Sequence, residues 1–244
     1  MGWMHDTLQF FARDPAWRRW HQDDLTFAML YEGDEAFLMP LSHDEVVHGK
    51  GALLAKMPGD VWQRFANLRL LLAYQYTRPG KKLLFMGTEL APWEEWSHDQ
   101  ALLQPDDSGP LRQGFHGFVA ALGRLYRERS PLWRHDHDGQ GFEWIDHHDH
   151  ESSVLSYLRK DGPWLTAVVL NLTPVPRDGY RVGLPRGGTW RLVLDSDAEA
   201  WGGSGYLGHE RFVADGVPWH GRPCSIQVDL PPLAAVVLEP VGDA

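Results

Sequence analysis

The sequence predicts an α/β part followed by an all-β part that forms an antiparallel β-sandwich. Up to about residue 130, short apolar runs alternate with longer segments of helical periodicity, as in α/β folds that contain parallel strands. After Ser130-Pro131 the pattern changes to short β-prone runs separated by Gly, Pro and Asp turns. The chain has 244 residues, which is enough for one large or two ordinary domains.

The α/β part begins with two expected short helices, at Thr7 to Arg13 and at Leu25 to Tyr31, joined by an acidic and aromatic connector. A strand is expected at Phe37 to Leu41. This run carries no charge, which predicts a strand that is buried on both faces.

A longer helix is expected to begin at Asp60. Gln63 stands where a capping box requires it, and apolar side chains then recur at helical spacing up to the stop signal Pro79-Gly80. A second buried strand is expected at Lys82 to Gly87, and a second long helix at about Gln113 to Arg129. This succession of strand, helix, strand and helix is typical of a (β/α) barrel, but only two strands can be identified, whereas a closed barrel needs about eight.

The all-β part is predicted as an antiparallel β-sandwich of about 110 residues. Its expected strands are Phe142 to Ile145, Val154 to Arg159, Leu165 to Asn171, Tyr180 to Val182, Trp190 to Asp195, Arg211 to Ala214, Ser225 to Leu230 and Ala234 to Pro240. The boundary is short and lies near residues 130 to 136. We expect the sandwich to have its own two-sheet core and to fold alone.

Composition restricts the class of partner. The 33 acidic and 23 basic residues give a formal net charge of −10, which argues against a nucleic-acid or anionic-membrane partner and is compatible with a neutral polysaccharide. The single cysteine, Cys224, is typical of a reducing compartment. Because the chain has no long apolar span and no basic-then-apolar leader, we expect a soluble cytoplasmic protein. Aromatic faces can stack on sugar rings, but most of the 12 tryptophans are expected in the core.

Three polar residues, His43, Asp44 and Glu45, follow the first predicted strand after Ser42. Enzymes with parallel barrels carry catalytic side chains at the carboxyl ends of their strands. A carboxylate can accept hydrogen bonds from sugar hydroxyls and can stabilise an oxocarbenium-like transition state, and an imidazole can donate to a further oxygen. The segment therefore suggests glycosidic chemistry, although the same residues also suit a solvated turn or a helix N-cap.

Longer segments, spread over nearly the whole chain, resemble the bacterial 1,4-α-glucan (glycogen) branching enzymes of the α-amylase superfamily. These segments are Met1-Gly-Trp-Met-His-Asp-Thr7, Leu38-Met-Pro-Leu-Ser-His-Asp-Glu-Val-Val-His-Gly-Lys50, Met57-Pro-Gly-Asp60, Phe65-Ala-Asn-Leu-Arg69, Pro79-Gly-Lys-Lys-Leu-Leu-Phe-Met-Gly87, Gly141-Phe-Glu-Trp144, Asn171-Leu-Thr-Pro-Val-Pro-Arg177 and Pro231-Pro-Leu-Ala234. The resemblance implies that residues 1–131 are the carboxyl-terminal part of a (β/α)8 catalytic barrel, with its last strands and helices, and that residues 132–244 are the β-sandwich domain.

The resemblance also implies an activity and two site residues. Branching enzymes cut an α-1,4-glucan chain and transfer the segment to a 6-hydroxyl, which makes α-1,6 branches in glycogen. Asp44 matches the family's aspartate that stabilises the transition state and contacts the substrate, and His43 matches the substrate-binding histidine before it. The motifs of the nucleophile and of the general acid/base are not found in the chain. We therefore expect the isolated chain to be inactive, and we expect its partners to be α-1,4-glucan and the missing amino-terminal part of the barrel.

Other interpretations remain open at this point. Asp44 with Glu89 is the one carboxylate pair that could be suggested for a retaining reaction, which needs two carboxyls about 5 Å apart. The clusters at residues 135–138 and 147–150 contain His and Asp but lack helical metal-ligand spacing, so neither a metal nor a cofactor is expected. The chain could also be a non-catalytic carbohydrate-binding or interaction module that uses the sandwich and the loop from Trp93 to Trp96. A fragment of a hydrolytic α-amylase relative is the third alternative.

Overall fold

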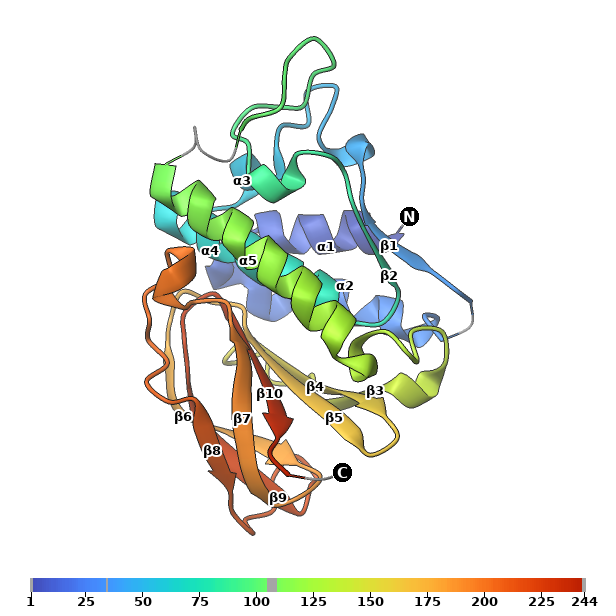
Figure 1. The fold of residues 1–244 in the computed structure, drawn as a ribbon, viewed down its shortest axis with the longest axis vertical. Coiled ribbons are helices and arrows are strands. Elements are labelled where there is room, and N and C mark those ends of the chain that lie inside the picture. Colours follow the sequence, from blue (N-terminus) through green and yellow to red (C-terminus); the bar gives the residue numbers. More distant parts are fainter. Residues whose placement is uncertain (1, 34, 105–108, 243–244) are drawn as a thin grey trace.

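The computed structural model describes residues 2–33, 35–104 and 109–242. Figure 1 shows a helical half that contains a small parallel sheet, packed on a half made of antiparallel strands. The helices are α1 (Gly2–Ala12), α2 (Asp23–Thr26), α3 (Leu53–Lys56), α4 (Val61–Thr77) and α5 (Gly109–Glu128). The strands are β1 (Leu38–Leu41), β2 (Lys81–Leu84), β3 (Phe142–Asp146), β4 (Val154–Asp161), β5 (Trp164–Asn171), β6 (Arg177–Leu184), β7 (Gly188–Asp195), β8 (Arg211–Ala214), β9 (Cys224–Leu230) and β10 (Ala234–Pro240).

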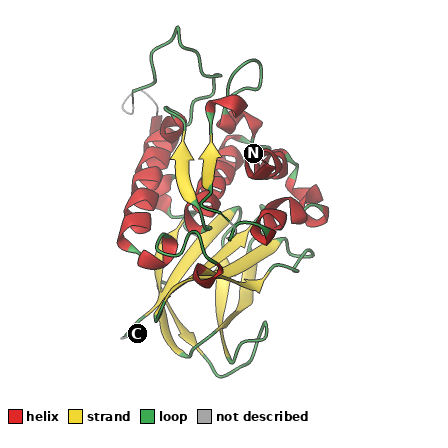
Figure 2. Ribbon diagram, turned by 90° about the vertical axis from the view of Figure 1, so that its right-hand side faces the viewer, coloured by secondary structure: helices red, strands yellow, loops and turns green. Residues whose placement is uncertain are grey.

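The predicted alternation of strand and helix is confirmed. β1 and β2 pair in parallel, with Leu38 opposite Lys81 and Leu41 opposite Leu84. The connection between them runs through α3 and α4, and α5 follows β2. Figure 2 shows the two strands side by side with helices around them. This is the arrangement of two successive βα units of a barrel.

The predicted start and stop of α4 are confirmed. The Gln63 amide donates to the Asp60 carboxylate at 2.8 Å, and the Asp60 amide donates to the Gln63 side chain at 3.0 Å, which completes the capping box. The helix ends at Thr77, before Pro79 and Gly80. Gly80 has φ of +93°, a conformation that favours glycine.

Three helices begin earlier than predicted. The helix expected at Leu25 to Tyr31 is α2 from Asp23, followed by a 3-10 turn at Phe27–Leu30. α1 starts at Gly2, because Trp3 and Met4 are buried and hold its first turn against the core. α5 starts at Gly109, because Pro110 suits the first turn of a helix. The φ of proline is already helical, and the N–H that proline lacks would have no partner within the helix at this position.

The prediction that β1 is buried on both faces is wrong, and β2, predicted as a second buried strand, is only partly buried. Met39 and Leu41 are buried against the helical core, but Leu38 is 57% exposed and Leu83 is 38% exposed. The physical reason is that the described chain supplies two strands of this sheet, so no further layer covers the second face. The absence of charge in this run is typical of a strand in a larger sheet than the two strands that these residues form.

The predicted β-sandwich is confirmed, and every predicted β-run forms a strand. Six strands pair in the order β3-β4-β5-β10-β7-β8, and β6 pairs with β9 in a second, two-stranded sheet. The pairs in both sheets are antiparallel. A core that includes Val169, Trp190, Ile226 and Val236 lies between the sheets.

The six-stranded sheet is covered on its other face by the helices. Along β5, Ala167 and Val169 belong to the core between the sheets, whereas Val168 and Leu170 belong to the core shared with the helices. Strand β5 is therefore apolar on both faces, as expected of a central layer. The expectation that the sandwich folds alone does not agree with this packing, because removing the helices would expose an apolar sheet face.

Buried polar groups also cross between the two halves. The Tyr157 hydroxyl on β4 lies 2.6 Å from the Thr77 hydroxyl on α4, and the Arg69 guanidinium on α4 donates to the Ser196 carbonyl at 2.7 Å. These bonds require the halves to keep one relative position. Among the described helices, none is long and apolar enough to span a bilayer.

Candidate functional site

The predicted site residues lie at the carboxyl end of β1. After Leu41, Ser42 begins a turn of 3-10 helix formed by His43–Glu45. The Ser42 hydroxyl donates to Asp44 Oδ2 at 2.8 Å, and His43 Nε2 lies 3.4 Å from Asp44 Oδ1. The Asp44 side chain is 43% exposed, so its carboxylate is held by short local contacts and still reaches solvent.

An aromatic row connects this turn with the end of β2. The His43 ring lies 5.8 Å from the Phe85 ring, and Phe85 lies 5.1 Å from Trp96 in an edge-to-face contact. The Phe85 amide donates to the Leu41 carbonyl at 3.0 Å. The structure therefore brings the ends of both parallel strands together around His43.

Glu95 holds the two loops of the site together. Its carboxylate accepts the amide of Gly49 at 2.9 Å and the amide of Gly51 at 2.7 Å, and the Trp96 amide donates to the Val46 carbonyl at 3.1 Å. The hydrogen bond from Gly49, then that from Gly51, lowers the pKa of Glu95. Sequence analysis missed this role, because a glutamate in a polar loop carries no signal for a bond to amides more than 40 residues away.

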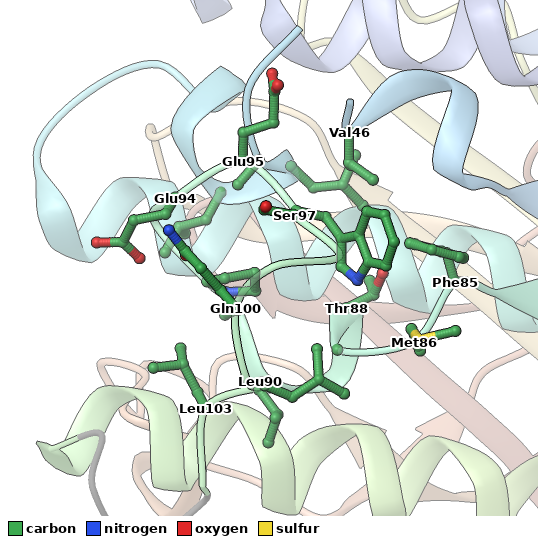
Figure 3. Close-up of a pocket in the computed structure, with 18 of the residues that line it drawn as sticks. Val46, Phe85, Met86, Thr88, Leu90, Glu94, Glu95, Ser97, Gln100 and Leu103 are labelled. Carbon is green, nitrogen blue, oxygen red and sulfur yellow. The ribbon is translucent and has the colours of Figure 1, made fainter. Parts of the chain in front are cut away.

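A pocket of about 280 Å³ lies beside the aromatic row. Figure 3 shows Val46 at one end of this pocket, Phe85 and Met86 on one side and Leu90 and Leu103 below, and Trp96 also lines it. Further lining residues are Leu53, Leu54, Leu68, Leu102 and Arg112. The lining is mainly apolar, so the pocket supports the Trp96 loop and offers a shaped wall next to the Asp44 turn.

The loop from Trp93 to Trp96 is less open than a solvent-facing sugar rim. Trp93 is half-buried, packs edge-to-face on Phe65 at 6.1 Å and has the Arg64 guanidinium at 5.8 Å from its ring. Trp96 is also half-buried and forms part of the pocket wall.

Asp44 is the carboxylate that the turn itself orients, through the Ser42 hydroxyl and beside His43. Glu45, next to Asp44, is paired with Lys50 at 3.1 Å. Glu89 lies in the turn Thr88–Leu90, and within the described ranges neither a hydrogen bond nor an ion pair joins it to Asp44. Asp44 can accept hydrogen bonds and stabilise positive charge, but a retaining reaction needs a second carboxylate about 5 Å away.

The two His and Asp clusters serve as local turns and ion pairs. His135 Nδ1 lies 2.9 Å from Asp138, which raises the pKa of His135, and His148 donates its amide to Asp146 at 3.0 Å. Across residues 2–33, 35–104 and 109–242, no three His, Cys, Asp or Glu side chains converge as a metal site would require.

Comparisons with known proteins agree with the fold. Residues 144–241 match the family described as the alpha amylase C-terminal all-beta domain. The chain is 52% identical over 242 residues to the 1,4-alpha-glucan branching enzyme GlgB of Methylococcus capsulatus, covering 99% of this chain and 33% of that protein. It is 50% identical to GlgB of Aquifex aeolicus, covering 99% of this chain and 39% of that protein. The GlgB of Pseudomonas aeruginosa is 50% identical over 99% of this chain and 33% of its own length.

The chain thus spans about a third of the length of these curated relatives. Among solved structures, an alpha-amylase from Geobacillus thermoleovorans superimposes with a TM-score of 0.65 at 16% identity, over 97% of this chain and 46% of that one. An Anoxybacillus alpha-amylase gives a TM-score of 0.64 at 15% identity, over 99% and 47% of the two chains. These two likenesses concern the fold.

Proposed function

We propose that this chain, a homologue of part of the 1,4-alpha-glucan branching enzymes, supplies the last barrel strands and the β-sandwich of such an enzyme. In this proposal residues 1–131 belong to the catalytic barrel and residues 132–244 to the β domain. The complete enzyme cuts an α-1,4-glucan and transfers the segment to a 6-hydroxyl. The observation that carries the proposal is a sequence identity of 52% to a branching enzyme over 99% of this chain. It is joined by an oriented carboxylate, that of Asp44, at the end of a parallel strand.

Asp44 is the proposed transition-state stabiliser, and both Asp44 and His43 are proposed to bind substrate. A carboxylate fixed by the Ser42 hydroxyl and flanked by an imidazole is preorganised, so little rearrangement is needed when positive charge develops on the sugar. The Phe85 and Trp96 rings support the His43 ring from one side. The nucleophile and the general acid/base come from outside this chain, and the chain alone is proposed to be inactive.

The exposed face of the β1–β2 sheet supports the partner in this proposal. Leu38 and Leu83 present apolar side chains to solvent, and among the described residues β1 and β2 pair only with each other, which leaves their outer edges unpaired. The rest of a barrel would cover this face and pair with these edges. The net charge of −10 and the single cysteine support a neutral polysaccharide substrate, the absence of a nucleic-acid or membrane partner, and a cytoplasmic location.

A chimera tests the proposal. The matching third of the Pseudomonas aeruginosa relative would be replaced by this chain, and branching of amylose would be followed by loss of iodine staining and by the chain-length profile after debranching. Asp44→Asn should lower turnover by at least about 100-fold with little change in glucan binding, because it removes charge but keeps size. His43→Ala should have a smaller effect on turnover and should also weaken affinity. Asp99→Asn, at a loop carboxylate that is 79% exposed, is the matched control and should behave as wild type.

Three outcomes would contradict the proposal. Equal and small effects of Asp44→Asn and His43→Ala would mean that the turn is not catalytic. Release of reducing ends without new branches would favour the hydrolytic alternative. Activity of the 244-residue chain alone, lost in Asp44→Asn, would instead support the pair of Asp44 with Glu89.

A further inference from the structure

An exposed aromatic pair lies in the connector between α1 and α2, outside the Asp44 turn. Trp17 is 60% exposed and Trp20 is 63% exposed, and both belong to the 3-10 turn Pro15–Trp20 between α1 and α2. Their ring centroids are 5.5 Å apart and their planes are tilted by 40°. Two large indoles side by side in solvent form a patch that the core does not explain.

The turn that carries these rings is firmly anchored. Arg18, between the two tryptophans, is fully buried and donates to the Leu172 carbonyl and to the Phe11 carbonyl, both at 2.8 Å. Gln22, just after the turn, donates to the Val154 carbonyl at 3.2 Å. The turn is thus attached to β4 and to the end of β5, so the two exposed rings stand on a rigid support.

Trp20 is also oriented by its own neighbour. The Arg19 guanidinium lies 5.0 Å from the Trp20 ring centroid, and Arg19 is paired with Glu151 in the turn before β4. With Arg19 against its ring, Trp20 is still 63% exposed and so remains available to a ligand. The ordering of an exposed ring in this way has no benefit for the core, because Trp20 stays largely in solvent.

We propose that Trp17 and Trp20 form a binding platform for an α-1,4-glucan chain, separate from the Asp44 turn. This inference rests on the proposed function only for the identity of the polymer. Flat, uncharged indole faces suit the apolar faces of sugar rings, and adjacent rings at 5.5 Å can contact two successive glucosyl units. The tilt between the rings suits a chain that bends at each linkage, as an α-1,4-linked chain does.

Such a platform would act through effective concentration. A glucan chain held at a second point on the same molecule meets the Asp44 turn as an intramolecular partner, so weak contacts at the platform raise the overall affinity for long chains. Short oligosaccharides cannot occupy both places and gain nothing. The platform therefore favours long glucan chains over short ones.

Affinity electrophoresis of the 244-residue chain in gels that contain glycogen measures this binding directly. Trp17→Ala with Trp20→Ala should weaken glycogen retardation by about tenfold, because two stacking contacts are lost. Trp164→Ala is the matched control, since Trp164 is 58% exposed but stands alone on β5, and it should leave retardation unchanged. Arg19→Ala should give a smaller loss of retardation than the double variant. Trp20→Phe should keep part of the binding that is lost when Trp20 is replaced by alanine. Urea midpoints of the tryptophan variants should match wild type, because Trp17, Trp20 and Trp164 are each more than half exposed.

Further measurements separate this inference from its alternatives. Maltohexaose should compete with glycogen for the platform. Cellohexaose, which is a straight chain, should not compete. Retardation of the double variant within twofold of wild type, or an equal loss in Trp164→Ala, would overturn the platform. A change from dimer to monomer on gel filtration with unchanged retardation would make the patch a contact between copies, and would also overturn it. If the chimera does not branch amylose, the proposed function fails while glycogen retardation still decides the platform.

Discussion

Replacing Arg159 by methionine should destabilise both halves of the molecule at once. Arg159 lies on β4 and is fully buried. Its guanidinium donates to Asp136 at 2.8 Å, to the Thr77 carbonyl at 2.9 Å and to the Gly141 carbonyl at 3.0 Å. Thr77 is the last residue of α4, so this one side chain joins the six-stranded sheet to the helical half.

The expected cost follows from what the substitution leaves behind. Methionine fills much of the same volume but removes every donor. Asp136 would keep the Lys81 ammonium at 3.3 Å and the Tyr126 hydroxyl at 2.9 Å, and two carbonyls would lose a bond. Removing one partner of a buried ion pair costs about 3–5 kcal/mol. Lys160→Met is the control at the next residue, because the Lys160–Glu143 pair at 2.9 Å is solvent-accessible and such pairs contribute about 0–1 kcal/mol.

Urea unfolding followed by near-ultraviolet circular dichroism and by hydrogen exchange would measure the effect. With an m-value of about 2–3 kcal/mol/M, the midpoint of Arg159→Met should fall by about 1–2 M, and amides of α4 and of β5 should lose protection together. A free energy of unfolding within about 1 kcal/mol of that of Lys160→Met would refute the argument from buried pairing. Loss of protection in α4 with β5 unchanged would refute the shared core and would restore the expectation of an independent sandwich.

Two further predictions concern carboxylates whose pKa values are shifted. Glu95→Gln should speed hydrogen exchange at the amides of Gly49 and Gly51. Because the pKa of Glu95 lies below its ordinary 4.5, its stabilisation of the wild-type loops should be present above pH 4.5 and should disappear as the pH falls through the lowered pKa. Equal exchange in variant and wild type at neutral pH would contradict this prediction. Burial raises the pKa of Asp195 from 3.8 to about 6, so stability is lost as the pH rises from the ordinary value through the raised one, and the loss is complete above it. Asp195→Asn should therefore increase the free energy of unfolding by about 1–3 kcal/mol at pH 8 and by much less near pH 4. The Asp197 amide, which donates to Asp195 at 2.8 Å, can donate to the asparagine oxygen as well, and equal stabilisation at both pH values would show that charge is not the cause.

Much of the fold could be predicted because its signals are local. The capping box at Asp60, the stop at Pro79 and the alternation of apolar runs each depend on residues a few positions apart. The position of Asp44 at the end of a strand belongs to the same kind of signal. Helix starts were less predictable, since the first turn of α1 is held by the burial of Trp3, which depends on the tertiary core.

Only part of the candidate site could be predicted from such local signals. His43 and Asp44 were predicted from their place after a strand, and their catalytic role remains a prediction. The contact of His43 with Phe85 and the bonds of Glu95 to loop amides join residues about 40 positions apart or more, and no periodicity encodes them. Distances of this kind follow from the parallel pairing of β1 and β2.

The sequence by itself determined the order and kind of the elements and the resemblance to a glucan-branching family, because residue spacing and sequence motifs are properties of the chain. Only the tertiary structure decided which aromatic residues face solvent. Trp93 and Trp96, which stand in the more suggestive loop, are half-buried, whereas Trp17 and Trp20, in an ordinary connector, are exposed. It also decided that the six-stranded sheet is covered on both faces. Burial is a sum over neighbours that are distant in the chain, so it exists only once the helices and sheets have packed.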